Sequence, residues 1–211
     1  MKLTEQEIAL FYKLWYRLVW GINEKHRVIQ KFKKPVYGTR LTVSMEAFVI
    51  IRDQIWEHPQ WIDEFLADTE NYEFTKLERG IIVLWRKHFV KGKFLVFKHL
   101  QKHSVLMRFD KQPNMLYGVC GISDPIKVAF PQSLPFLVNM VLLPFMGKVI
   151  YDGIASEYNI AFGPGLRSDA KEWFDESQKM YGIVEMLNGE LNIPIVQDPS
   201  TGKIEQNRCC K

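Results

Sequence analysis

The first ninety residues repeat their apolar positions at intervals of three and four, which places them along one side of an α-helix. Thr4 and Glu7 form a capping pair that begins such a helix, because each side chain can satisfy a backbone amide of the first turn. The apolar residues that follow at helical spacing are Ile8, Phe11, Leu14, Trp15, Leu18, Val19 and Ile22. The pattern predicts a helix that continues to about residue 28 and buries one wide face.

Three further helices are predicted before residue 90. Ser44 can cap the second, and His58-Pro59 ends it because proline disfavours helical geometry at the preceding residue. A short third helix should follow over residues 60–67. Thr75 and Glu78 repeat the capping pattern ahead of a fourth helix that ends near residue 89.

After Gly92 the pattern changes to short apolar runs separated by turn residues, which is typical of β-strands. The runs cover residues 93–100, 104–109, 115–122, 136–143, 148–154 and 158–163. Most connections between them are too short for a crossover helix, so the sheet should be largely antiparallel.

A last helix is expected from a cap at Ser168 to about Met180, with Gly182 as its stop. The predicted fold class is therefore α+β, with a helical N-terminal region packed on a small bent antiparallel β-sheet or barrel closed by a C-terminal helix. The expected organisation is a helical region over 1–90, a β-rich region with the helix over 91–187, and a loosely ordered tail over 188–211. The residues expected in the core include Trp15, Leu18, Trp85 and Val149.

Composition agrees with a folded chain of the cytoplasm. Hydrophobic residues make up 47% of the sequence, far from the composition of disordered proteins. Three cysteines, two of them adjacent, do not form a secreted disulfide framework. The N-terminus lacks the pattern of a secretory signal, and the most apolar run, Leu134 to Met146, is shorter than the about 20 residues of a membrane span. We expect a cytoplasmic protein without a membrane partner.

The formal net charge of +4 hides a segregation of charge along the chain. Residues 25–40 carry six Lys or Arg and no acid, whereas the segment from 53 to 78 is rich in Asp and Glu. Cations that alternate with aromatic rings can follow a phosphate backbone while bases stack on the rings. This predicts a non-enzymatic protein that binds nucleic acid or a nucleoprotein. The residues expected to bind are Lys31, Lys33, Lys34, Arg40, Lys91 and Lys93. An acidic protein partner would suit the same surface, so an adaptor function stays open.

A second hypothesis is an enzyme or binder that acts on a phosphorylated small molecule. Gly163, Gly165 and Arg167 precede a predicted helix, whose free amides and positive dipole end attract phosphate. Asp152 could serve there as a general base if it were buried beside another carboxylate. The same residues also fit a tight strand-to-helix turn, and Asp152-Gly153 fits a hairpin turn or a bulge before a turn at Ser156-Glu157. In that interpretation Asp152 is a lone carboxylate, without a partner that would shift its pKa.

Other candidate chemistry is sparse. His99 and His103 are four residues apart but should flank a hairpin turn as solvated side chains, and Cys120 in its strand context should be a buried thiol. No catalytic residue, metal site or cofactor is predicted.

The segments "LLPFMGKVIYDG" (142–153), "YNIAFG" (158–163) and "YGI" (181–183), with Gly165, resemble an uncharacterised family of bacterial cytoplasmic proteins often seen in Firmicutes. The resemblance implies fold and compartment but no activity. Some relatives end in an SEC-C zinc module, to which "DPSTGKIEQNRCCK" is similar at Gly202-Lys203 and Cys209-Cys210. The first C-x-C pair is missing here, and two thiolates do not complete a four-ligand zinc site, so we interpret the tail as degenerate.

Deleting residues 190–211 should leave the melting temperature within a few degrees, because this segment has few large apolar groups to bury. Thermal unfolding of the full and truncated chains tests this. A truncated chain that fails to fold, or stoichiometric zinc in the purified protein, would contradict it.

Overall fold

The computed structural model describes residues 1–38, 44–69, 72–158 and 162–187. The helices are α1 (Glu5–His26), α2 (Met45–Glu57), α3 (Gln60–Ala67), α4 (Lys76–His88), α5 (Ile126–Ala129) and α6 (Pro164–Tyr181). The strands are β1 (Val90–His99), β2 (Ser104–Arg108), β3 (Leu116–Cys120), β4 (Phe136–Phe145), β5 (Lys148–Tyr158) and β6 (Ile183–Val184). The molecule is an α+β fold with helices first and strands from residue 90 onward, as the change of period predicts.

The N-terminal helices begin where their capping residues predict. Both capping boxes are present, at Thr4 with Glu7 and at Thr75 with Glu78, and the Ser44 hydroxyl accepts from the Ala47 amide. The His58-Pro59 pair separates α2 from α3 as expected. Each of these signals acts within one helical turn, so the local sequence is sufficient to place the helix ends.

Five strands close into a barrel. The sheet order is β2-β1-β4-β5-β3-β6, and β2 also pairs with β3, so the ring β1-β4-β5-β3-β2 is complete. Within this ring the β3–β5 pair is parallel and the other pairs are antiparallel. Closure removes the exposed sheet edges of these strands. The predicted antiparallel sheet is therefore a mixed one, and its bent or barrel form is confirmed.

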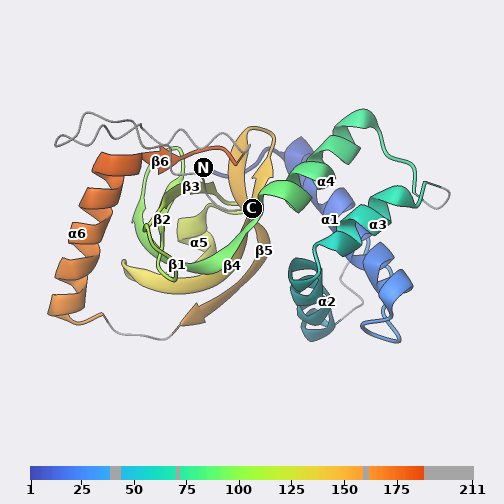
Figure 1. Ribbon diagram of the computed structural model, residues 1–211, viewed down its shortest axis with the longest axis horizontal. Helices are drawn as coiled ribbons and strands as arrows, with labels where there is room; N and C mark the ends of the chain where they lie inside the picture. Colours follow the sequence, from blue (N-terminus) through green and yellow to red (C-terminus); the bar gives the residue numbers. More distant parts are fainter. Residues whose placement is uncertain (39–43, 70–71, 159–161, 188–211) are drawn as a thin grey trace, which may run out of the picture.

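Three apolar clusters hold the layers together. Alternate residues of the strands fill the barrel interior, where α5 contributes Ile126 and Phe130 follows it. The outward residues Val141, Leu143 and Ile150 pack against the N-terminal helices. Figure 1 shows these helices on one side of the ring of strands, α6 on the opposite side and α5 within the ring. The barrel is thus the middle layer between two helical layers.

Helix α6 covers the outer face of β1, β2 and β3. Its Ala170 and Phe174 pack against Leu95, Val105 and Met107, and the Phe174 ring lies 4.3 Å from that of Phe97 in a stacked arrangement. A ring of five strands in this order, with a helix between the third and fourth strands, has the topology of the OB-fold.

Two details of the C-terminal half differ from the sequence prediction. The expected strand over 148–154 continues to Tyr158 as β5. Of the strand expected over 158–163, only Tyr158 lies in β5, and residues 159–161 lie outside the described residues. The last strand, β6, follows α6. The helix does not begin with a cap at Ser168 but at Pro164, with Gly163 as N-cap and no side-chain cap. Proline with its fixed φ suits the first helical position, and this preference outweighs the Ser168 signal. Gly182 ends α6 as predicted, with φ of 67°.

The expected core positions Trp15, Leu18, Trp85 and Val149 are all buried. Trp85 also donates from its indole Nε1 to the Pro144 carbonyl oxygen at 3.0 Å, which ties α4 to β4. Replacing Trp85 by Ala should lower the free energy of unfolding by about 3–5 kcal/mol, because it leaves a large cavity and an unpaired carbonyl. Urea denaturation measures the loss.

The matched control for this prediction is Leu84→Ala on the same helix, since Leu84 is 39% exposed. It should change the free energy of unfolding by about 0.5 kcal/mol or less. Equal losses for the two variants would show that the buried face of α4 has been assigned wrongly.

Candidate functional site

Asp152 lies at the centre of a buried polar cluster between α2 and β5. Its carboxylate accepts hydrogen bonds from Arg52 Nε at 2.5 Å and Nη2 at 3.1 Å, from Trp56 Nε1 at 2.9 Å, and from the Ile154 amide at 3.3 Å. Asp152 is fully buried, and Arg52 is 5% exposed. The interpretation of Asp152 as a lone carboxylate is therefore wrong. Its partner comes from a helix one hundred residues away, which local sequence does not reveal.

The electrostatics of this cluster favour a structural role. Burial raises the pKa of the Asp152 carboxyl, and the guanidinium of Arg52 opposes that rise. Burial alone would lower the pKa of Arg52, but the charge and hydrogen bonds of Asp152 raise it overall. The Arg52 Nη1 atom also donates to Asp53 Oδ1 at 2.6 Å. The cluster fastens α2 to the barrel and leaves Asp152 without solvent access.

A bulge in β5 accompanies this arrangement. The β4–β5 pairing passes from Leu142–Tyr151 to Met140–Ala155, so three residues of β5 face one of β4. Gly153, inside the bulge, has φ of 88°, a backbone conformation that favours glycine. The bulge alternative for Asp152-Gly153 is confirmed. The turn expected at Ser156-Glu157 is wrong, since both residues pair with β4.

The phosphate-site residues are not brought together. Gly163 and Gly165 are exposed at the start of α6, and the exposed Arg167 donates from Nε to the Phe162 carbonyl oxygen at 2.9 Å. Asp152 is instead enclosed by Arg52 and Trp56. Asp152 is therefore not available as the general base expected for the 163–168 turn.

The predicted basic residues lie on two different elements. Lys31, Lys33 and Lys34 are exposed on the connection after α1, whereas Lys91 and Lys93 belong to β1. The Lys91 ammonium lies 3.6 Å from the Glu57 carboxylate, and that of Lys93 lies 5.2 Å from the ring centre of Tyr158. Arg40 lies outside the described residues. Lys34 lines two hollows of the surface.

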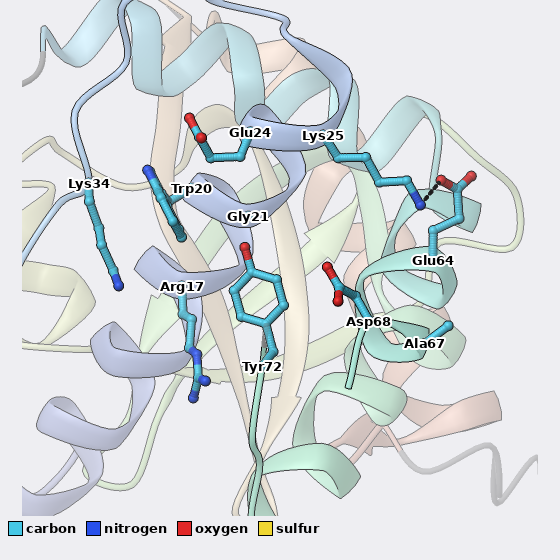
Figure 2. A pocket seen from close by; sticks show the side chains of 10 residues that line it. All are labelled: Arg17, Trp20, Gly21, Glu24, Lys25, Lys34, Glu64, Ala67, Asp68 and Tyr72. Atoms are coloured by element: carbon cyan, nitrogen blue, oxygen red, sulfur yellow. Dashed lines mark ion pairs between the residues drawn. The ribbon is translucent and has the colours of Figure 1, made fainter. Parts of the chain in front are cut away.

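Two adjoining hollows lie along α1 on the N-terminal layer. The larger has a volume of about 840 Å³, and Figure 2 shows its lining residues. They are Arg17, Trp20, Gly21, Glu24, Lys25, Lys34, Glu64, Ala67, Asp68 and Tyr72. The smaller hollow has a volume of about 320 Å³ and is lined by Tyr12, Lys13, Tyr16, Arg17, Lys34, Pro35, Val36 and Tyr37. We call the pair the α1 groove.

Arg17 and Lys34 line both hollows and therefore mark their junction. The Lys34 ammonium lies 4.6 Å from the ring centre of Trp20, and the Arg17 guanidinium lies 4.4 Å from that of Phe74 and 5.5 Å from that of Tyr72. Arg17 Nη1 also donates to the Glu73 carbonyl oxygen at 2.8 Å. Two cations are thus held beside aromatic rings at the middle of the groove.

The two hollows differ in charge. The larger is lined by three cations and three carboxylates, and its Glu64 pairs with Lys25 at 2.9 Å. In the view of Figure 2, Arg17, Trp20 and Lys34 lie on one side of Tyr72, and Asp68, Glu64 and Lys25 lie on the other. Among the described residues, no carboxylate lines the smaller hollow. The groove is therefore most positive at its junction and in the smaller hollow.

Tyrosines form much of the smaller hollow. The Tyr12 and Tyr37 rings are stacked with centres 5.3 Å apart, and the Tyr16 ring lies 5.3 Å from that of Tyr12. Burial raises the pKa of Tyr16 to about 12, so its hydroxyl stays protonated near neutral pH. The hollow presents neutral aromatic rings beside fixed positive charge.

Sequence reasoning missed this aromatic row although its signal was present. Tyr12, Tyr16 and Trp20 recur every four residues on α1, which places them on one face beside the buried stripe. Lys13 and Arg17 follow the same spacing one residue later. A second stripe of half-buried rings with cations beside it is the pattern that could have identified the groove.

The remaining candidates are structural. Cys120 is buried as expected, and burial raises the pKa of its thiol. His99 and His103 flank the β1–β2 turn, but the expectation that both are solvated is wrong, since His103 is 7% exposed. Within the described residues, no group of three or more His, Cys, Asp or Glu side chains could hold a metal.

Comparisons with known proteins give no match: neither a family model, nor a curated protein, nor a solved structure corresponds to this chain. The resemblance based on residues 142–183 therefore stays a prediction. Over the part of the chain that the structure describes, no helix is both long and apolar enough to cross a membrane.

The Arg52–Asp152 pair can be tested by a double-mutant cycle. Asp152→Asn should cost about 3–5 kcal/mol in free energy of unfolding, because it removes the buried counterion of Arg52 and leaves it only the more exposed Asp53. The double variant Arg52→Met/Asp152→Leu should lose less than the sum of the single variants, since no uncompensated charge remains. Additive losses, or a cost of Asp152→Asn below about 1 kcal/mol, would contradict this role.

Proposed function

We propose that the protein is a non-enzymatic binder of single-stranded nucleic acid and that the α1 groove holds the strand. The observation that carries this proposal is the placement of Arg17 and Lys34 at the junction of two hollows that are otherwise rich in aromatic rings. A phosphate at the junction would meet both cations, and the bases on either side of it would enter the two hollows. Unpaired bases are required, because paired bases do not expose their faces to such rings.

The cations beside the rings do not prevent base stacking. An exposed cation–π contact contributes about 0.5–1 kcal/mol. A base stacked on an aromatic side chain contributes about 1–3 kcal/mol. Lys34 can therefore leave the Trp20 ring for a phosphate while a base takes its place, and the exchange is favourable. The exposed Lys31 and Lys33 on the same connection extend the positive surface beyond the groove.

The outer face of the barrel supports a ligand less well. In a barrel of this topology the strand 2–3 face is the usual place for an oligonucleotide. Here Phe174 of α6 packs on that face with Phe97, and the Lys98 ammonium lies 4.4 Å from the Phe174 ring centre. Binding there would require α6 to be displaced, whereas the α1 groove is open. Lys91 and Lys93 do not line the groove and are not needed by the proposal.

Replacing Lys31, Lys33 and Lys34 together by Ala should weaken binding to all single-stranded sequences and reduce its salt dependence. Phosphate neutralisation releases counterions, so each lost contact should flatten the slope of log affinity against log salt by about 0.7. The expected change corresponds to about two to three contacts. The measurement is fluorescence anisotropy of labelled single-stranded and duplex oligonucleotides at several salt concentrations.

Two further variants separate the groove from general charge effects. Trp20→Ala should weaken binding about tenfold without changing the salt slope, because it removes stacking and leaves the phosphate contacts. Arg167→Ala, which removes an exposed cation at α6, should have little effect. Absence of binding even at low salt would overturn the proposal and favour a protein adaptor. A phosphate-dependent loss with Arg167→Ala alone would favour the small-molecule hypothesis.

A further inference from the structure

The larger hollow differs from the smaller one in carrying carboxylates beside its rings. Glu24, on α1, and Asp68, after α3, lie on the lining together with Trp20 and Tyr72. Burial raises the pKa of Tyr72, and the negative charges of Asp68 and Glu24 raise it further, as expected for carboxylates close to its hydroxyl. The rings, the two carboxylates and the junction cations therefore line the same hollow.

Close packing fixes the position of Tyr72 in this space. A Cβ atom on Gly21 would lie 2.7 Å from the Tyr72 hydroxyl oxygen and 2.4 Å from Phe65 Cε2, so the glycine lets both rings approach α1. The Phe65 and Tyr72 ring centres are 4.5 Å apart. The aromatic wall is thus set by the backbone of α1, the helix that also carries Glu24.

We propose, on the basis of the proposed function, that the larger hollow selects bases that carry an exocyclic amino group over thymine and uracil. An ionised carboxylate only accepts hydrogen bonds, and its two oxygens have about four acceptor positions, so one existing partner does not exhaust it. The amino group of cytosine donates to Asp or Glu, whereas thymine presents a carbonyl oxygen at that position. Thymine in this hollow places its carbonyl oxygen against a carboxylate oxygen, and both of these groups only accept hydrogen bonds.

Glu64 does not share this role, although it lines the same hollow. Its carboxylate lies 2.9 Å from the Lys25 ammonium and 3.4 Å from His26 Nε2. Glu24 also has a cation beside it, since Arg27 Nη1 lies 3.6 Å from its carboxylate, so the difference from Glu64 is one of position. The carboxylates whose charges raise the pKa of Tyr72 are Asp68 and Glu24. Glu64 therefore provides a matched control for Glu24 and Asp68.

The test compares ten-nucleotide oligomers of deoxycytidine and of thymidine by fluorescence anisotropy at pH 7.5. The two have the same backbone and bases of similar size, so phosphate contacts and stacking are nearly equal. We expect the cytosine oligomer to bind about fivefold more tightly. The variant Glu24→Gln/Asp68→Asn should bring the ratio of the two affinities to within about twofold, because amides also donate to carbonyl oxygens. Glu64→Gln should leave the ratio unchanged.

The ratio is the readout because removing two negative charges strengthens binding of both oligomers. Equal affinities in the unsubstituted protein would overturn the preference and leave the proposed function intact. A preference that persists in Glu24→Gln/Asp68→Asn, or disappears in Glu64→Gln, would overturn the assignment of Glu24 and Asp68. If neither oligomer binds at low salt, the proposed function and the preference both fail.

Discussion

The buried Arg52–Asp152 ion pair is the constraint on which the arrangement of the two halves depends. It joins α2 to β5 with two hydrogen bonds, and Trp56 adds a third from the same helix. Removing Arg52 leaves Asp152 buried without a counterion, and removing Asp152 leaves Arg52 with only the more exposed Asp53, so the pair holds the helical layer and the barrel in one relative position. The apolar cluster around Trp15, Trp85 and Phe145 supplies most of the buried area, but it is less directional than this pair.

This arrangement determines which surfaces are left for a ligand. The barrel is covered by the N-terminal helices on one side and by α6 on the other, as Figure 1 shows. The N-terminal layer buries one face of α1 against the barrel and turns the Tyr12, Tyr16 and Trp20 face toward the groove. The proposed site is therefore carried by a helix whose opposite face is fixed in the core.

Local signals predict the elements well, and long-range pairings explain most of what they miss. The capping boxes at Thr4 and Thr75 and the break at Pro59 act within one turn, so their helix boundaries follow from sequence. The partner of Asp152 and the ring of strands depend on contacts between distant residues, which no local pattern encodes. In the groove, the cluster of positive charge predicts Lys34. The interpretation of α1 as an amphipathic helix accounts for its buried face and does not identify Arg17 or the row of Tyr12, Tyr16 and Trp20.

The central claim is that the ligand binds to the face of α1 and leaves the barrel face under α6 unoccupied. The indole N–H signals of the six tryptophans in a two-dimensional ¹H–¹⁵N NMR spectrum, each assigned by a Trp→Phe variant, report on both places. Trp20 lines the groove, and Trp173 lies on α6 beside Phe109. On addition of a single-stranded oligonucleotide the account predicts that the Trp20 signal shifts and the Trp173 signal stays in place. A shift of Trp173 with Trp20 unchanged would contradict it.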